Sequence, residues 1–286
     1  MTPIETLRSF VNTWECDENA HLNVQFYYDR FADADAHFKF LTGLEDRILG
    51  DSPVRHVRYH SELFSKDLIS VTSAVVRDGP FPVTIVHQMR EIITGRLSAT
   101  ALDGYPDGDP VVLDDLDLPW IDPDPIFMAR SVDGAPGQAI ADFTDHPHVV
   151  SHRSVIQPQG CGVGGAVLDR QMIACCSDAA AHVWEFGGLN LQWLDEHDMG
   201  RVAVEMKRTL VGQKPGAGAL IHLVSQFVAV REKTFSFRHD LIDTRAGKSF
   251  AVVEVTGMII DAKARKVIQV PDHIHNALIA RGALVV

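Results

Sequence analysis

The pattern of apolar positions predicts two long helices. From Val24 to Leu41, apolar residues recur at three- and four-residue steps, the spacing that places them on one face of a helix. A second segment, AVLDRQMIACCSDAAAHVWEF (Ala166 to Phe186), is apolar around most of its circumference. We therefore expect an amphipathic helix in the first half of the chain and a more enclosed helix in the second half.

Short strand-like runs follow the helices. After the second helix they are HLVSQFVAV, TFSFRHDLID, KSFAVVEVTGMIID and KVIQV, separated only by REK, TRAG and AKAR. Connections this short join antiparallel neighbours, because a parallel pair needs a crossover of a dozen or more residues. The predicted fold class is α+β, with one long helix wrapped by an antiparallel sheet in each half.

Two separate blocks of the first half recur in the same order in the second half. DADAHFKFLTG (Asp33 to Gly43) matches DAAAHVWEFGG (Asp178 to Gly188) at an offset of 145 residues. VTIVHQMREIITGRLSATA matches FSFRHDLIDTRAGKSFAVV at an offset of 152, and the histidines His87 and His239 coincide. Two matched blocks in one order indicate a duplicated unit.

A stretch rich in Asp, Pro and Gly separates the two copies, between about Asp103 and Pro147. Such a composition is typical of a connection with short ordered pieces. We predict a first unit at residues 1–125, a linker at 126–147 and a second unit at 148–286.

The composition is that of a globular protein, with 46% apolar and 22% charged residues. The net charge of −12 argues against nucleic acid as a partner, because binding to phosphates needs clustered Lys and Arg. No apolar run is long enough to span a membrane and MTPIETLRSF lacks the features of a signal peptide, so we expect a cytoplasmic protein. The four cysteines show neither a disulfide framework nor C-x-x-C spacing, which indicates reduced thiols.

The charge is unevenly distributed. Residues 1–143 contain 11 Lys and Arg against 24 Asp and Glu, whereas residues 144–286 contain 15 against 14. A polyanionic small ligand is therefore better tolerated by the second half. The basic candidates there are Lys207, Arg208, Lys214, Arg231 and Lys233.

Four polar residues precede the first helix at every second position: Asp17, Asn19, His21 and Asn23. Followed by Tyr27 or Tyr28, they resemble the D-x-N-G-H-x-N…Y signature of hot-dog-fold acyl thioesterases, the family that includes 4-hydroxybenzoyl-coenzyme A thioesterase. Ala20 stands where that signature has Gly. The duplication extends the resemblance over most of the chain, as in double hot-dog proteins.

The resemblance implies hydrolysis of an acyl-coenzyme A thioester. Asp17 is the general base or the nucleophile, and Asn19, His21 and Asn23 orient the loop or a water. We expect the backbone amides near Ala20 and His21 to form the helix N-terminus and to polarise the carbonyl. The expected substrate-binding residues are Tyr27, Tyr28, Gly164 and Gly165. A purely structural interpretation is that Asp17 or Asn19 only caps the helix.

The second copy lacks these groups. At an offset of 145, Asp17 meets Gly162 and His21 meets Ala166. The resemblance thus implies a pseudo-dimer within one chain, with one working site and one degenerate site, and it is compatible with a homodimer of such chains. Gly160, Gly162 and Gly165 also satisfy the dinucleotide-binding pattern G-x-G-x-x-G. The antiparallel runs that follow argue against that interpretation.

Two further functions remain open. A hot-dog hydratase or dehydratase would use Asp and His together, but its D-x-N-P-x-H signature differs in spacing and contains a Pro that is absent here. A duplicated domain could also bind an acyl thioester without turnover. We expect no cofactor beyond the coenzyme A of the substrate, no membrane partner and no metal, since the His pairs in DHPHVVSH and PDHIH lack a completing ligand set.

Overall fold

The computed structural model describes residues 2–17 and 19–286. The chain divides into two compact units, Met1–Pro136 and Gly137–Val286, and the division lies within the segment expected to be the linker. In the part of the chain that is described, no helix is long and apolar enough to cross a membrane.

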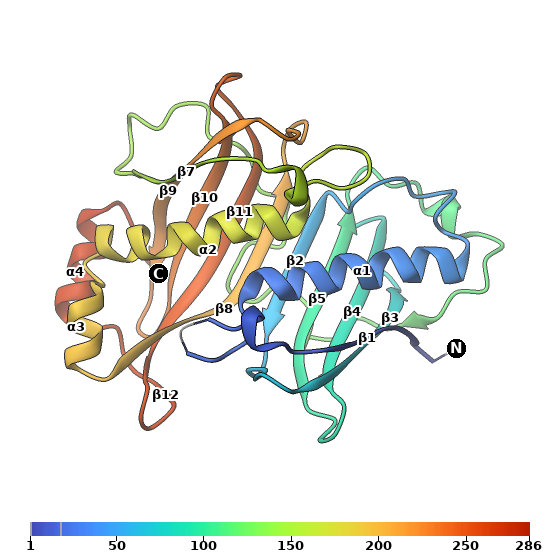
Figure 1. Ribbon diagram of the computed structural model, residues 1–286, viewed down its shortest axis with the longest axis horizontal. Helices are drawn as coiled ribbons and strands as arrows, with labels where there is room; N and C mark the ends of the chain where they lie inside the picture. Colours follow the sequence, from blue (N-terminus) through green and yellow to red (C-terminus); the bar gives the residue numbers. More distant parts are fainter. Residues whose placement is uncertain (1, 18) are drawn as a thin grey trace. The chain divides into compact units, whose positions relative to one another are not determined.

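The first unit is one long helix on an antiparallel sheet (Figure 1). The sheet order is β1-β3-β4-β5-β2, and the short β6 pairs with β3 in parallel. α1 runs across the face of these strands. The elements are β1 (Ile4–Phe10), η1 (Thr13–Glu15), α1 (Val24–Thr42), β2 (Val54–Tyr59), β3 (Leu68–Val76), β4 (Val83–Glu91), β5 (Leu97–Tyr105), η2 (Pro110–Leu113) and β6 (Trp120–Ile121).

The second unit repeats this plan and adds two helices. Its sheet order is β8-β11-β10-β9, and both β7 and β13 pair with β9. α2 crosses these strands as α1 does in the first unit. The elements are β7 (Val149–Val155), η3 (Pro158–Gly160), α2 (Asp169–Phe186), α3 (Leu191–Glu196), β8 (Met199–Leu210), β9 (Leu220–Val230), β10 (Phe235–Asp243), β11 (Lys248–Asp261), β12 (Lys266–Val267), α4 (Asp272–Ala280) and β13 (Leu284–Val285).

Strand register confirms the predicted duplication. His87 lies opposite Ser73 on β3 and Ala101 on β5. Its counterpart His239 lies opposite Ser225 on β9 and Val253 on β11. All three pairs of equivalent positions differ by 152 residues, so the two sheets have the same register around the histidine.

The sequence of α1 sets both of its ends. The Asn23 side chain accepts a hydrogen bond from the Gln25 amide and caps the N-terminus, and Gly43 ends the helix in the left-handed conformation at φ 72°. Such a conformation costs a residue with a Cβ atom free energy that glycine avoids. Between these ends Phe31, Ala34 and Phe38 are fully buried, so the predicted apolar face is the face that packs on the sheet.

Two segments differ from the expectation. Asp103 to Tyr105 belong to β5 instead of the connection, and β8 was not predicted. Charged residues inside both strands explain the difference, because they break the apolar pattern. Lys207 and Arg208 on β8 were expected to be surface residues for the coenzyme. That expectation is wrong, since they are 1% and 0% exposed and pair with Glu254 (2.8 Å) and Asp169 (2.7 Å).

The buried face of α1 gives a direct test of the packing. Phe38→Ala should lower the free energy of unfolding by about 3–5 kcal/mol, because it leaves a cavity in a closed core. Phe38 is 0% exposed, whereas Phe40 on the same helix is 67% exposed. Phe40→Ala should therefore change the free energy by only about 0.5 kcal/mol. Urea unfolding of both variants measures the difference, and equal effects would contradict this orientation of α1.

Candidate active site in the first unit

The polar motif forms a tight turn that precedes α1. Cys16 and Leu22 form an antiparallel bridge, and within it the Asp17 amide donates to the His21 carbonyl at 2.8 Å. The Ala20 amide donates back to the Asp17 carbonyl at 3.0 Å. Ala20 therefore has φ 60°, in the left-handed region that glycine occupies without strain. This geometry explains why the signature of the resembling family has Gly at this position.

The Asp17 carboxylate holds the turn together. Its Oδ1 accepts hydrogen bonds from the Asn19 amide at 2.9 Å and from the His21 amide at 3.1 Å. Asp17 is half-buried, while Asn19 and Ala20 are exposed. The side chain thus has a structural role in the turn and also lies at its surface, where a ligand can approach.

The structure corrects the expected source of the polarising amides. α1 begins only at Val24, with Asn23 as its cap. The amides of Ala20 and His21 therefore lie in the turn before the helix, and both donate to Asp17. An amide that already has an acceptor is a weak candidate for stabilising an oxyanion, so the expectation that these two amides form the helix N-terminus is wrong.

The segment after β2 lies against the turn and completes its surroundings. The Leu22 amide donates to the Leu63 carbonyl at 2.8 Å, and His21 forms a bridge with Phe64. The His21 ring meets the Phe64 ring edge-on with the centroids 5.0 Å apart. His21 Nδ1 lies 3.4 Å from Glu62 Oε1, and both side chains are partly buried. Glu62 is thus a carboxylate that the sequence motif did not reveal, because it lies 41 residues after His21.

A buried ion pair attaches the turn to α1. Glu15 forms a hydrogen-bonded pair with Arg30 of α1 at 2.8 Å, and the Glu15 carbonyl accepts from the Asn23 amide at 2.9 Å. Although burial acts to raise it, hydrogen bonds from Asn12 and Arg30 hold the pKa of the Glu15 carboxyl below its ordinary value. The motif is therefore fixed at both ends to the same helix.

The second unit builds the same turn without the chemistry. The Gly162 amide donates to the Ala166 carbonyl at 2.9 Å, and the Gly165 amide donates to the Gly162 carbonyl at 2.8 Å. Gly165 has φ 78°, the equivalent of Ala20. The backbone is conserved at the offset of 145 residues, yet Asp17, Asn19 and His21 are replaced by Gly162, Gly164 and Ala166. The glycines of the G-x-G-x-x-G pattern therefore belong to a turn closed by the antiparallel bridge between Cys161 and Val167, just before α2.

The four residues expected to bind substrate lie in different surroundings. Tyr27 and Tyr28 are 4% and 0% exposed and belong to the core of the first unit. Burial raises the pKa of the Tyr27 hydroxyl to about 12, and its ring meets that of Tyr59 edge-on. Gly164 and Gly165 are exposed in the turn of the second unit.

A pocket of about 500 Å³ in the first unit lies apart from the motif. It is formed by the end of β3, the residues before β4, η2 and β6. Val76, Phe81, Leu113 and Trp120 supply its apolar lining. No motif residue lines it, so it is separate from the candidate site.

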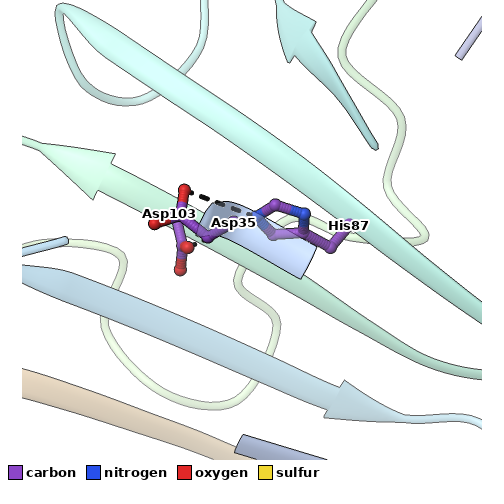
Figure 2. Close-up of side chains that lie close together, drawn as sticks. All are labelled: Asp35, His87 and Asp103. Atoms are coloured by element: carbon purple, nitrogen blue, oxygen red, sulfur yellow. Dashed lines mark ion pairs between the residues drawn. The ribbon is translucent and has the colours of Figure 1, made fainter. Parts of the chain in front are cut away.

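The sequence also failed to reveal a buried cluster of Asp35, His87 and Asp103. These side chains come from α1, β4 and β5 and point toward one another (Figure 2). One carboxylate oxygen of each aspartate and one ring nitrogen of His87, atoms that could bind a metal ion, all lie within 4.8 Å of one another. Only His87 was noted from the sequence, as a shared strand position, because the three residues are separated by 52 and 16 positions along the chain.

The strained position in the turn can be tested by a reciprocal pair of substitutions. Ala20→Gly removes the left-handed strain, worth about 1 kcal/mol, but gives the unfolded chain more freedom, so we expect a net gain near 0.5 kcal/mol. Gly165→Ala in the second unit should cost a net of about 0.5 kcal/mol, because an added Cβ meets no atom within 4 Å and the backbone strain of about 1 kcal/mol is partly offset by the lower freedom of the unfolded chain. Thermal melting measures both, and a destabilised Ala20→Gly variant would contradict the strain.

Comparison with known proteins supports the fold. The thioesterase-like superfamily matches residues 155–278, and no curated protein sequence matches the chain. The solved structure of an oleoyl thioesterase from Lactobacillus plantarum superposes with a TM-score of 0.62 at 9% identity, covering 88% of this chain and 94% of that one. An acyl-ACP thioesterase from Bacteroides thetaiotaomicron gives 0.59 at 11%, covering 88% and 96%.

A third solved structure extends this likeness to a plant protein. The 12:0-ACP thioesterase from Umbellularia californica gives a TM-score of 0.54 at 14% identity, over 88% of this chain and 93% of that one. Coverage of nearly the whole of each chain means that both units are matched. The resemblance to the hot-dog-fold thioesterases is therefore confirmed: the second unit matches the thioesterase-like superfamily, and the whole chain has the double hot-dog fold.

Proposed function

We propose that the protein hydrolyses an acyl thioester at the turn that precedes α1. One observation carries this proposal: both units build the same turn, but only the first equips it with Asp17, Asn19 and His21. The same backbone hydrogen bonds close the turn in both units, so the turn itself is part of the fold. The polar side chains occur in one unit only, and we therefore assign them to the reaction.

The reaction needs a carboxylate close to the thioester carbonyl. In one route Asp17 removes a proton from a water that attacks the carbonyl carbon, and this proton passes to the sulfur as the carbon–sulfur bond breaks. In the other route the carboxylate attacks that carbon directly, the thiolate leaves, and a water then cleaves the acyl–Asp17 anhydride, which restores the carboxylate and supplies the proton of the thiol. Both routes require the ionised carboxylate. The side-chain amide of Asn19, an exposed residue of the same turn, is our proposed donor to the carbonyl oxygen, in place of the backbone amides of Ala20 and His21.

We propose coenzyme A as the thiol carrier. Two of the similar solved structures are acyl-ACP thioesterases, so an acyl carrier protein is the alternative. That carrier is acidic, and residues 1–143 contain 24 Asp and Glu against 11 Lys and Arg. Like charges on both partners disfavour the encounter. We further propose that hydrolysis needs no cofactor besides the coenzyme A of the substrate, because a carboxylate suffices to activate water.

Asp17→Asn should reduce thioester hydrolysis at least about a hundredfold, the size expected for removing a base or nucleophile. The asparagine Oδ1 still accepts from the amides of Asn19 and His21, so the turn is kept while the charge is lost. Asp33→Asn, an exposed position on α1, is the matched control and should leave the rate unchanged. Free-thiol release from panels of acyl-coenzyme A and acyl-ACP esters is the assay.

The same assay separates the alternatives. If the unchanged protein releases thiol only from acyl-ACP esters, coenzyme A is the wrong carrier, but the proposed hydrolysis is correct. If it releases no thiol from either panel, the proposed hydrolysis is wrong. Addition of water to an enoyl thioester would then favour the hydratase, and tight binding of the ester without turnover would favour a binding protein.

Glu62→Gln should lower kcat by roughly tenfold, less than the loss at Asp17, because Glu62 acts through His21 and not on the substrate. Its Oε1 lies 3.4 Å from His21 Nδ1, so the carboxylate positions the ring. Glu45→Gln, at an exposed residue, is the control. A Glu62→Gln variant with an unchanged pH profile and an unchanged kcat would exclude this positioning role.

A further inference from the structure

The cluster of Asp35, His87 and Asp103 lies inside the first unit, away from the proposed site. The three side chains are 5%, 0% and 0% exposed. His87 Nε2 lies 3.3 Å from Asp103 Oδ2 and 4.0 Å from Asp35 Oδ1. Asp35 follows Asn23 by twelve residues along α1, which is about 18 Å. The cluster is therefore outside the catalytic turn.

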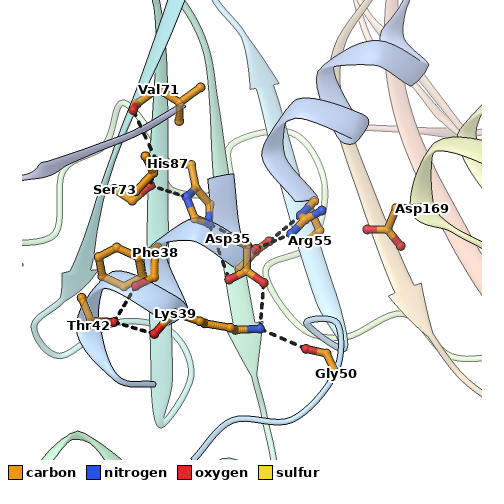
Figure 3. Close-up of polar contacts among 12 residues, drawn as sticks. Asp35, Phe38, Lys39, Thr42, Gly50, Arg55, Val71, Ser73, His87 and Asp169 are labelled. Atoms are coloured by element: carbon orange, nitrogen blue, oxygen red, sulfur yellow. Dashed lines mark hydrogen bonds and ion pairs between the residues drawn. The ribbon is translucent and has the colours of Figure 1, made fainter. Parts of the chain in front are cut away.

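Two cationic side chains hold the outer sides of the carboxylates (Figure 3). Arg55 of β2 donates from Nε and Nη2 to the two oxygens of Asp103, at 2.7 and 2.5 Å. Lys39 of α1 lies 2.7 Å from Asp35 Oδ2 and donates to the Gly50 carbonyl at 3.0 Å. The Tyr105 ring of β5 covers the Lys39 ammonium at 5.1 Å. Each carboxylate thus has one cation. Asp35 Oδ1 and Asp103 Oδ2 face His87, and Asp103 Oδ2 also accepts from Arg55 Nη2.

A chain of hydroxyl groups leads to His87 Nδ1. The Thr6–Ser73 and Ser73–His87 Nδ1 contacts, both 2.7 Å, can each run in either direction. When Thr6 Oγ1 gives its one hydrogen to the Val71 carbonyl at 3.3 Å, Ser73 donates to Thr6 and His87 Nδ1 donates to Ser73. In a neutral imidazole the Nε2 atom is then a bare acceptor.

Three acceptor atoms therefore face one another with no hydrogen between them. Asp35 Oδ1 and His87 Nε2 are buried without a hydrogen-bond partner among the described residues 2–17 and 19–286. Leaving buried acceptors unsatisfied is costly, and it is more so when two of the groups are anions. The arrangement requires a small cation or a proton at its centre.

The surrounding charge decides between these two. A divalent metal would add two positive charges beside Arg55 and Lys39 in a site closed to water, and it would need an entry path. A proton supplies the missing hydrogen with half that charge. We propose that Asp35, His87 and Asp103 hold one buried proton between His87 Nε2 and the inner carboxylate oxygens.

The neighbouring pKa shifts agree with this assignment. Burial, and next the negative charge of Asp103, raise the pKa of Asp35, which favours a proton at this side of the cluster. Burial acts against Asp103, but the charge and hydrogen bonds of Arg55 hold the pKa of that carboxyl well below its ordinary value. Asp103 thus stays ionised and attracts the proton.

The second unit provides an internal comparison. His239 Nδ1 contacts Ser225 at 2.7 Å, and Ser225 contacts Ser151 at 2.6 Å, so the hydroxyl chain is repeated. The positions equivalent to Asp35 and Asp103 are Ala180 and Val255. Without carboxylates, burial lowers the pKa of His239 to about 3, with a smaller contribution from His152. The same histidine is therefore neutral where the two anions are missing.

The proton makes the stability of the first unit depend on pH. Above about pH 6.5 an unfolded histidine has lost its proton, so the folded state binds one proton more than the unfolded state. This proton should contribute a fall of about tenfold per pH unit to the folding equilibrium constant. The useful window ends near pH 8, because the raised pKa values of Cys175 and Cys176, caused by burial, act in the same direction above it.

Asp35→Asn is the test of this linkage. The asparagine keeps one oxygen for Lys39 and offers an amide hydrogen to His87 Nε2, so the proton is no longer required. Urea unfolding between about pH 6.5 and 8 measures both proteins, and the folding equilibrium constant of the unchanged protein divided by that of Asp35→Asn should fall about tenfold per pH unit. The ratio is used because His60, His152, His222 and His239, whose pKa values burial lowers, add an opposing slope equally to both proteins. His239→Gln, which breaks the matching hydroxyl chain, removes only the opposing contribution of His239 and should not weaken the fall. Equal slopes in Asp35→Asn and the unchanged protein would overturn the proposal.

Nitrogen NMR of the unchanged protein gives a second measurement that needs no folded variant at Asp35. With ¹⁵N-labelled histidine, we expect His87 to show both ring nitrogens protonated, or Nε2 hydrogen-bonded to a protonated carboxyl, up to pH 8. His239 should show one bare nitrogen. A neutral His87 with its hydrogen on Nε2 and none on Nδ1 would overturn the proposal. So would a bound metal whose removal by a chelator lowers the melting temperature.

Discussion

The packing of one long helix on one face of an antiparallel sheet is the constraint on which each unit depends. α1 must bury Phe31, Ala34 and Phe38 against its strands, because apolar surface of that size is unstable in water. Once the helix is fixed, its first turn and the segment before it are fixed as well. The Glu15–Arg30 pair at 2.8 Å joins that segment to the helix. The place of the polar turn is thus a consequence of core packing.

Duplication separates what the fold requires from what chemistry requires. The bridge of Cys16 with Leu22 recurs as Cys161 with Val167, and the left-handed residue recurs as Gly165. These features close a turn before a helix, so both copies keep them. The carboxylate, amide and imidazole of the first turn have no counterpart in the second. The second turn closes with backbone bonds alone, whereas the first adds the bonds that Asp17 Oδ1 accepts from the amides of Asn19 and His21.

Buried charge is a second recurring feature of the two sheets. Arg55 with Asp103, Lys207 with Glu254 and Arg208 with Asp169 all involve cationic groups that are almost completely buried. Removing such charges from water is expensive, and close pairing with hydrogen bonds offsets much of that cost. In the first unit the pairs Arg55–Asp103 and Lys39–Asp35 lie beside His87, whereas in the second unit Val255 and Ala180 stand at the positions equivalent to the two carboxylates. The two cores therefore have the same backbone but different electrostatics.

The sequence by itself determined the elements whose residues lie close together in the chain. The apolar period defined α1, the short polar connections defined the antiparallel strands, and the two offsets defined the duplication. The spacing of Asp17, Asn19 and His21 drew attention to the segment before α1, but the sequence predicted a helix N-terminus where the structure has a separate turn. Only the tertiary structure decided that Glu62 faces His21 and that Asp35, His87 and Asp103 converge. Strand pairing and helix packing bring these residues together, and no local pattern records contacts made across such sequence distances.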